Sequence, residues 1–252
     1  MATDWLMSWA MSPVYVWQGV AIRRKIERML PPLGPRSGLM GTSDDKDVAI
    51  RLLVIGDSSA AGVGVEQIED SLAPRLAERI YALTGLPVFW RAAGSNSAVC
   101  ADVRDHVVPN LTREAFTHIV LSIGTNDAKN FHGGRRFKKS FGTLLYALKA
   151  KWPEARIVWS PPVDFMRVPA LPRGLARVLE LRAGVIRRIG NRLCHERGAV
   201  PSTMLPRVEP AGFSRDGFHA SAEGYAYVAG HLAPYVLGDR PGTIEGRALG
   251  AS

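Results

Sequence analysis

Short apolar runs alternate with longer amphipathic stretches along the chain from residue 50 onward, and this alternation constrains the fold more than any other feature. The apolar runs have the length and composition of buried strands and cover residues 51–55, 88–91, 118–123, 156–160 and, more weakly, 199–204. The other stretches have the capping residues and the spacing of helices and cover residues 71–84, 101–111, 137–152, 175–197 and 222–237. Strand and helix in turn predict an α/β fold, a three-layer αβα sandwich around a mostly parallel five-stranded sheet.

The chain of 252 residues is long enough for one α/β domain with a substantial core. Its 46% hydrophobic and 22% charged residues are ordinary for a globular protein, which argues against disorder. We assign the domain to residues 50–237, with a Trp-rich segment and linker before it over residues 1–40. A Gly-rich tail over residues 238–252 is expected to be disordered. Cys100 and Cys194 form no metal-binding or redox motif, and two thiols in a chain of this size fit a reducing compartment at least as well as a disulfide.

The N-terminal segment differs from the rest of the chain. Residues 5–22 are apolar and contain three tryptophans, and a basic stretch at residues 23–28 follows. A secretory signal has its positive charge before the apolar stretch, so no cleaved signal is expected. The segment either packs on the domain or lies at a membrane interface, where Trp and basic residues are both favoured. Since basic flanks face the cytoplasm, we expect a cytoplasmic protein, with peripheral membrane contact through the N-terminus as one option.

The net charge of +9 raises the question of an anionic partner. The basic residues are scattered over the expected helices, and they accompany neither a nucleic-acid-binding motif nor interleaved stacking aromatics. We therefore expect a solvated basic surface and no nucleic-acid partner. A module that binds an anionic membrane surface remains the alternative from a different functional class.

The turn after the first apolar run of the domain carries a candidate nucleophile. Residues 56–62 read Gly-Asp-Ser-Ser-Ala-Ala-Gly, so a serine stands where a buried strand breaks into a turn of small residues. Ser58 could equally cap the following helix, and glycine-rich turns at such places also bind phosphate. However, the turn lacks both the lysine of a phosphate-binding loop and the GxGxxG pattern of dinucleotide-binding proteins. Ser58, directly after Asp57, is favoured over Ser59 as the nucleophile, and it needs a base to take its proton.

A base is available near the C-terminus, where Asp216 stands three residues before His219. Residues three apart in a turn or a first helical coil can face each other. Asp216 would then accept a hydrogen bond from one imidazole nitrogen of His219, which leaves the other nitrogen basic and directed at Ser58. An aspartate cap beside a surface histidine is the alternative.

Hydrogen-bond donors for an oxyanion stand in the loops after two later strands. Ligands of such sheets bind beyond the carboxyl ends of the strands, so these loops are expected to converge. Gly94 lacks a side chain, so its N–H can approach a substrate closely, and Asn126 can donate from its side-chain amide. The backbone N–H of Ser58 would be the third donor, and each donor typically contributes about 3 kcal/mol. Asn96 competes with Asn126 for this role.

These segments, in this order, resemble the SGNH (GDSL-type) hydrolase family. The similarity spans residues 50–237 and rests on Gly56-Asp57-Ser58, Gly94, Gly124-Thr125-Asn126-Asp127 and Asp216 with His219. The resemblance implies that Ser58 is the nucleophile, that His219 is the base and that Asp216 orients it. It also implies an oxyanion hole formed by the backbone N–H of Ser58, Gly94 and Asn126, a flavodoxin-like hydrolase fold, and no metal or organic cofactor. Asn96 departs from the arrangement in many members, which leaves the register of its loop open.

The sequence also points to a substrate class. Residues 161–171 are largely apolar, follow an expected strand and could line an acyl pocket, with residues 127–136 as the opposite wall. Apolar walls favour small-molecule or lipid acyl esters over a sugar backbone. We thus expect an esterase or lipase that works through an acyl-enzyme intermediate. A carbohydrate O- or N-deacetylase of the same family is the alternative.

Overall fold

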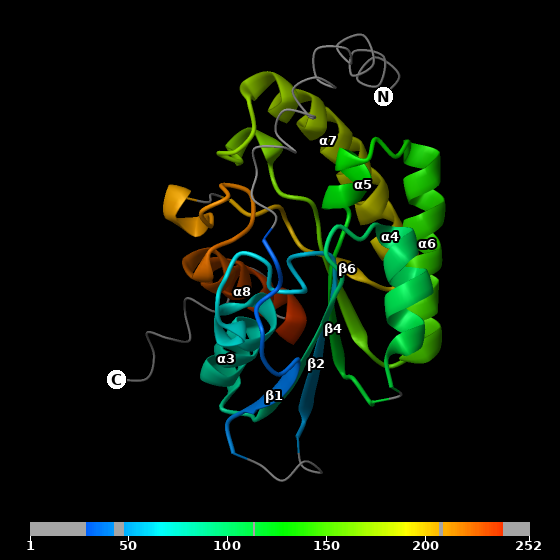
Figure 1. The fold of residues 1–252 in the computed structure, drawn as a ribbon. Helices are drawn as coiled ribbons and strands as arrows, with labels where there is room; N and C mark the ends of the chain where they lie inside the picture. Colours follow the sequence, from blue (N-terminus) through cyan, green and yellow to red (C-terminus); the bar gives the residue numbers. More distant parts are fainter. Residues whose placement is uncertain (1–28, 43–47, 113, 207–208, 239–252) are drawn as a thin grey trace.

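The computed structural model describes residues 29–42, 48–112, 114–206 and 209–238. They form a six-stranded sheet and the helices around it (Figure 1). The strands are β1 (Ser37–Met40), β2 (Ile50–Gly56), β3 (Val88–Gly94), β4 (His118–Ser122), β5 (Arg156–Ser160) and β6 (Val200–Pro201). Their order across the sheet is β1-β3-β2-β4-β5-β6. Strands β2 to β6 pair in parallel, whereas β1 at the edge is antiparallel to β3. The mostly parallel α/β sheet is confirmed.

Strand β2 lies inside the sheet and is buried on both faces. Leu53 and Ile55 belong to the apolar cluster on one face, and Leu52 and Val54 belong to the cluster on the other. Successive side chains of a strand point to opposite faces, so a strand covered on both sides reads as a continuous apolar run. This is why the sequence predicted the strand clearly.

Helices cover both faces of the sheet (Figure 1). The helices α3 (Leu72–Thr84) and α8 (Ala222–Leu237) pack together on one face. The other face carries α4 (Cys100–Asp102), α6 (Gly134–Lys151) and α7 (Arg173–Glu196). The short α5 (Thr125–Lys129) follows β4 and contacts α7. The three-layer αβα sandwich is therefore confirmed.

Helix α3 shows how the sequence specifies one of these layers. Its buried residues Leu72, Leu76 and Ile80 are four apart, so they fall on one side of the helix and pack toward the sheet. The helix ends at Gly85, which has a left-handed φ of 68° and donates its N–H to the Tyr81 carbonyl.

The sheet has one strand more than predicted. The sixth strand is β1, whose residues the sequence analysis assigned to the linker, and its Ser37 pairs with Arg91 of β3. A Cβ on Gly38 would lie 2.9 Å from the Trp90 ring, so the strand packs closely across that side chain. The sequence missed β1 because it has four residues at a sheet edge and lacks an apolar run of its own.

Two other expected elements also differ from the structure. The predicted helix over residues 101–111 is broken into α4, a π-helical turn (Val103–Val107) and a 3-10 turn (Val108–Asn110). Pro109 lacks a backbone N–H and cannot continue an α-helix. The predicted strand over residues 199–204 is reduced to β6. Further 3-10 turns are formed by Ile68–Asp70, Phe165–Arg167 and Pro210–Gly212.

None of the helices in the described part of the chain is long and apolar enough to cross a membrane. The Trp-rich stretch within residues 1–28 and the tail from residue 239 lie outside the described residues. Cys100 and Cys194 are both buried free thiols.

Candidate active site

The carboxyl ends of β3, β2 and β4 lie side by side, and the candidate residues follow these ends. Gly56, the last residue of β2, pairs with Gly94 of β3 and with Ser122 of β4. Ser58 comes two residues after Gly56, and Asn126 comes four residues after Ser122. The register therefore brings the loops of Ser58, Gly94 and Asn126 to one edge of the sheet.

Ser58 sits in a tight turn held by backbone hydrogen bonds. The Asp57 N–H donates to the Ser122 carbonyl, the Ala61 N–H to the Asp57 carbonyl and the Val63 N–H to the Ser58 carbonyl, each over 3.0 Å. Ser58 is 8% exposed. These bonds fix the backbone at Ser58 and thereby the position of its side chain at the end of β2.

Gly94 lies directly against this turn. A Cβ at residue 94 would be 2.0 Å from the backbone nitrogen of Ala61, which is closer than real atoms approach. A glycine is therefore required here for the two loops to pack together. The role of its N–H as an oxyanion donor stays a prediction.

Asp216 and His219 form a short hydrogen-bonded pair. His219 Nδ1 lies 2.6 Å from Asp216 Oδ2, and it donates the hydrogen because an ionised carboxylate can only accept. Asp216 Oδ1 also accepts the Ser214 hydroxyl and the N–H groups of Phe218 and His219, over 2.8 to 2.9 Å. Burial alone would raise the pKa of Asp216, but these hydrogen bonds outweigh it and hold the pKa well below its ordinary range. The pair leaves Nε2 of His219 as the basic nitrogen.

The loop of His219 packs on the loop of Ser58. A Cβ on Gly64 would lie 2.2 Å from the carbonyl oxygen of Ala220, the residue after His219, so the two backbones are in direct contact. The buried hydroxyl of Tyr225, in α8, donates to the Val63 carbonyl over 2.6 Å. The structure thus brings together the two segments that are farthest apart in the sequence motif.

The structure distinguishes the two candidate asparagines. Asn126 is buried at the end of β4 and donates one amide N–H to the Ala98 carbonyl over 3.0 Å, which fixes the amide and leaves its other N–H. Asn96 is exposed, and its amide donates to the Met29 carbonyl over 3.3 Å. These positions favour Asn126 as the oxyanion donor.

Sequence reasoning gave no role to two buried carboxylates beside the motif residues. The first is Asp57, whose pKa is raised to about 6, mainly by burial. The Ser59 N–H, 3.1 Å from Asp57 Oδ1, and the charges of Lys129 and His219 partly oppose this increase. The sequence did contain a signal for Asp57, because a carboxylate stands directly beside the candidate nucleophile at the end of an apolar run.

The second buried carboxylate is Asp127, directly after Asn126. Its oxygens accept the Cys100 N–H over 3.1 Å and contact His132 Nδ1 over 3.0 Å. Asp127 thus ties the loop after β4 to the start of α4 and to the segment after α5. It positions the loop that carries Asn126.

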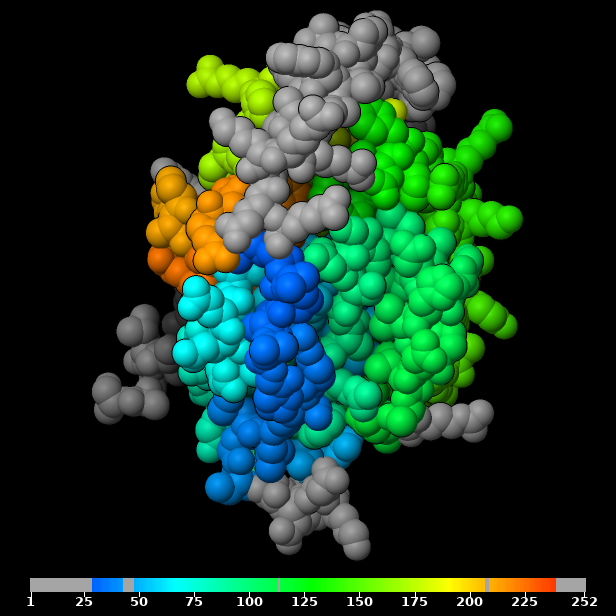
Figure 2. All heavy atoms as spheres, viewed as in Figure 1, coloured from blue at the N-terminus to red at the C-terminus, as the bar shows by residue number. Residues whose placement is uncertain are grey.

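Residues 29–36 lie along the loop of Ser58, and their surface is drawn in blue in Figure 2, beside the cyan part of the chain. The Arg36 guanidinium donates to the Ala61 carbonyl over 3.0 Å. The Ser214 hydroxyl lies 3.4 Å from the Met29 sulfur. The chain before β1 therefore contacts both the serine loop and the histidine loop.

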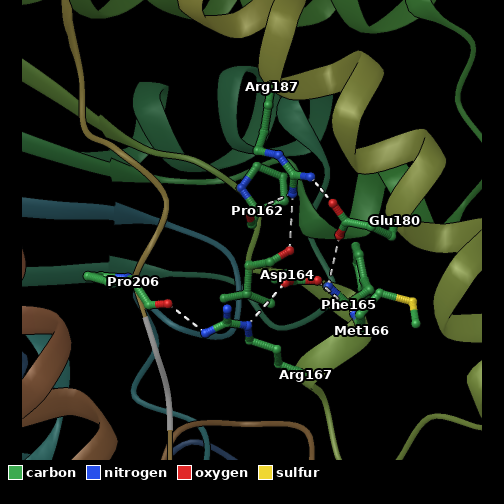
Figure 3. Close-up of polar contacts among 9 residues, drawn as sticks. Pro162, Asp164, Phe165, Met166, Arg167, Glu180, Arg187 and Pro206 are labelled. Carbon is green, nitrogen blue, oxygen red and sulfur yellow. Dashed lines mark hydrogen bonds and ion pairs between the residues drawn. The ribbon is translucent and has the colours of Figure 1, made fainter.

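The loop of residues 161–172, after β5, is fixed to α7 by hydrogen bonds to an ion pair within that helix (Figure 3). Arg187 pairs with Glu180 and donates to the carbonyls of Pro162 and Val163 over 3.2 and 3.3 Å. Glu180 also accepts the Phe165 N–H over 3.0 Å. Burial raises the pKa of Glu180, although the Arg187 charge opposes it.

Asp164 and Arg167 also shape this loop, and the Arg167 guanidinium donates to the Pro206 carbonyl (Figure 3). Asp164 accepts the Met166 N–H over 2.9 Å and pairs with Arg167 Nε over 3.2 Å. Farther along the loop, the Ala170 N–H donates to the Gly217 carbonyl over 3.0 Å. The predicted acyl-pocket loop therefore reaches the loop of His219.

The described residues contain no cluster of three or more His, Cys, Asp or Glu side chains that could hold a metal ion.

Comparison with known families now gives an assignment. The model of the GDSL-like lipase/acylhydrolase family matches residues 54–227, which is well over half of the chain. The chain belongs to this family. The predicted SGNH (GDSL-type) resemblance is thus confirmed, and the protein is a GDSL-like hydrolase. No curated protein sequence matches it.

Solved structures share the fold of this GDSL-like hydrolase at low sequence identity. A phospholipase A1 from Streptomyces albidoflavus is 17% identical with a TM-score of 0.51, and the match covers 76% of this chain and 100% of that one. The protein TesA is 16% identical with a TM-score of 0.60, covering 73% and 96%. A variant of an acetyl xylan esterase from Geobacillus stearothermophilus is 15% identical with a TM-score of 0.57, covering 76% and 96%.

Proposed function

We propose that this GDSL-like hydrolase cleaves carboxylic acyl esters with Ser58 as the nucleophile. The observation that carries the proposal is the 2.6 Å pair of Asp216 and His219, held on a loop that packs against the loop of Ser58. A serine hydroxyl is a weak nucleophile, and a histidine oriented by a carboxylate is the base that activates it.

In the first half-reaction, His219 Nε2 takes the Ser58 proton while Ser58 Oγ attacks the acyl carbon. Asp216 keeps its hydrogen bond to Nδ1 and stabilises the imidazolium. The N–H groups of Ser58 and Gly94 and the amide of Asn126 receive the negative charge on the carbonyl oxygen. His219 then gives its proton to the leaving alcohol, the ester C–O bond breaks, and the acyl group stays on Ser58.

In the second half-reaction, water replaces the alcohol. The water oxygen attacks the acyl-serine while His219 takes a proton from this water. The same donors form hydrogen bonds to the oxyanion. The proton returns to Ser58 as the bond to the acyl group breaks. The acid is released and the enzyme is regenerated.

The substrate proposal is a small-molecule or lipid acyl ester. Apolar residues of the loop after β5 support this proposal: Phe165 and Val168 are buried in the core, and Met166 is exposed. A carbohydrate deacetylase is the alternative within the family. Rates on p-nitrophenyl esters of C2 to C12 acids, compared with acetylated xylan and N-acetyl amino sugars, separate the two.

The nucleophile is tested with a fluorophosphonate probe and mass spectrometry of the labelled peptide. We expect the label on Ser58, and we expect Ser58→Ala to lower kcat by about 10³-fold or more because no other group forms the acyl-enzyme. Ser59→Ala is the matched control and should stay within tenfold of the wild type. A label on another residue, or Ser58→Ala activity within tenfold, would remove Ser58 from this role.

A further inference from the structure

Arg182, in the middle of α7, is a buried cation with no acidic partner among the described residues. The residue is 6% exposed, and its Nε has no hydrogen-bond acceptor in that part of the chain. Within the described part of the chain, the interaction of its guanidinium is with an aromatic ring, since its Cζ lies 4.1 Å from the ring centroid of Phe131. Burial lowers the pKa of Arg182, and no nearby carboxylate of the described residues opposes this decrease.

This arrangement is energetically unfavourable for the protein alone. An arginine remains protonated in proteins, so its charge is carried into the interior. A buried charge normally has an ionic or hydrogen-bonded partner. Stacking on a ring compensates only part of the free energy that is lost when the charge leaves water. A guanidinium kept in this state is therefore suited to an anionic ligand, because carboxylates and phosphates match its planar set of donors.

Arg182 lies on the catalytic side of the sheet. A Cβ on Gly124, just before Asn126, would contact the Ile186 side chain at 3.4 Å, which places Ile186 level with the end of β4. Helix α7 follows β5 and precedes β6, so it runs antiparallel to the strands. Arg182 precedes Ile186 by four residues, which is about 6 Å farther beyond the carboxyl ends of the strands.

The aromatic partner of Arg182 follows the helix that carries Asn126. Phe131 follows α5 and comes five residues after Asn126, and its φ of 58° is rare for a residue with a side chain. Such backbone strain concentrates at binding and catalytic sites. The helices α5 and α7 contact each other here, as Figure 1 shows. Arg182 and Phe131 therefore lie where α5 and α7 meet, beyond the strand ends.

A second cation lies near the catalytic histidine. Lys129, at the end of α5, has its Nζ 4.5 Å from the ring centroid of Phe218, and this ring packs edge-on against His219. The charge of Lys129 also lowers the pKa of Asp57. The α5 side of the site thus presents positive charge beside the proposed reaction centre.

We propose that Arg182 binds an anionic group of the substrate, so that the preferred substrates are acyl esters bearing a carboxylate or a phosphate. This inference rests on the proposed esterase function. The anion would sit against the guanidinium while the ester carbonyl lies at Ser58. Arg182 acts as a binding and specificity residue and takes no part in bond breaking.

The test compares esters that differ in charge. The first pair is p-nitrophenyl valerate and the p-nitrophenyl monoester of glutaric acid. Their acyl chains have the same length, but the first ends in a methyl group and the second in a carboxylate. The second pair is a monoacylglycerol and the lysophosphatidic acid with the same acyl chain. For each pair, the ratio of kcat/KM for the anionic ester to that for the neutral ester is measured, and the pair with the larger ratio identifies the anion.

We expect Arg182→Met to lower this ratio by about tenfold to a hundredfold, because a charge-assisted contact is lost. Arg182→Lys should restore part of it. Arg177→Met removes an exposed arginine of the same helix and should leave the ratio unchanged. An unchanged ratio in Arg182→Met would overturn the inference, and equal losses of kcat/KM on charged and neutral esters would indicate a structural role.

A binding measurement separates this inference from the esterase proposal. Ser58→Ala protein is titrated with glutarate and with inorganic phosphate, and the melting temperature is followed. We expect stabilisation by at least one anion, lost in the Ser58→Ala/Arg182→Met double variant. If Ser58→Ala retains full esterase activity, the nucleophile assignment fails while anion binding is still decided. If neither anion stabilises the protein, or the double variant responds equally, Arg182 is not an anion site.

Discussion

At the scale of single residues, the Asp216 carboxylate determines how His219 can act. It holds the imidazole through Nδ1 and is itself held by Ser214, Phe218 and the backbone of His219. Because these donors stabilise the ionised form, the pKa of Asp216 lies well below its ordinary range and the carboxylate stays charged. The imidazole therefore has one defined tautomer and a partner for the charge that it would gain in the proposed reaction.

Asp216→Asn should lower kcat on p-nitrophenyl butyrate by about 10² to 10⁴-fold, because the amide preserves the shape but does not stabilise the imidazolium. The control is Asp164→Asn, which changes a carboxylate that caps the turn after β5 and does not contact His219. A decrease of less than threefold in kcat for Asp216→Asn would contradict the role given to this carboxylate.

At the scale of elements, α7 fixes the loop that the sequence assigned to the acyl pocket. The Arg187 guanidinium reaches two carbonyls of this loop, and its partner Glu180 accepts the Phe165 N–H (Figure 3). The loop in turn bonds to Gly217, beside the Asp216–His219 pair. One helix thus positions both the pocket wall and a neighbour of the histidine loop.

Arg187→Met should lower the free energy of unfolding by about 1 to 3 kcal/mol, since it removes the cation that pairs with Glu180 and the donor of two carbonyls. It should also raise KM for long acyl esters more than for short ones, because the loop loses its fixed position. Urea unfolding and KM for p-nitrophenyl butyrate and laurate measure the two effects. Arg192→Met, an exposed position on the same helix, is the control. Equal changes in KM for both esters would argue against a pocket role.

At the scale of the whole molecule, stability is linked to the site through Asp57. Its pKa is raised to about 6 in the folded protein from an ordinary value of 3.8, mainly by burial. The folded state therefore holds this proton more tightly than the unfolded state. The associated stabilisation is fully present below about pH 4 and is lost as the pH rises through 6.

Asp57→Asn should consequently be more stable than the wild type at pH 8, by up to about 3 kcal/mol, because one pKa unit corresponds to about 1.4 kcal/mol. The amide oxygen can still accept the Ser59 N–H, so little else changes. Melting temperatures of both proteins from pH 4.5 to pH 8 measure the effect, and the difference should shrink toward pH 4.5. A difference that does not depend on pH would show that Asp57 is not the titrating group.

Prediction from sequence succeeded where a local pattern carries the information. The strand β2 and the helix α3 were predicted because a continuous apolar run and a four-residue apolar spacing are both visible along the chain. The turn at Ser58 and the spacing of Asp216 and His219 are equally local. In contrast, β1 and α5 were missed because each is four or five residues long and depends on a neighbouring element for its conformation.

The sequence by itself determined the layered fold, the family and the segments that hold Ser58, Asn126 and His219. Only the tertiary structure decided which polar side chains are buried. It separated buried Asn126 from exposed Asn96, and it showed that Arg182 lies inside the protein although an arginine on a helix is ordinarily exposed. The physical reason is that periodicity is a property of the local chain, whereas burial depends on which distant surfaces meet.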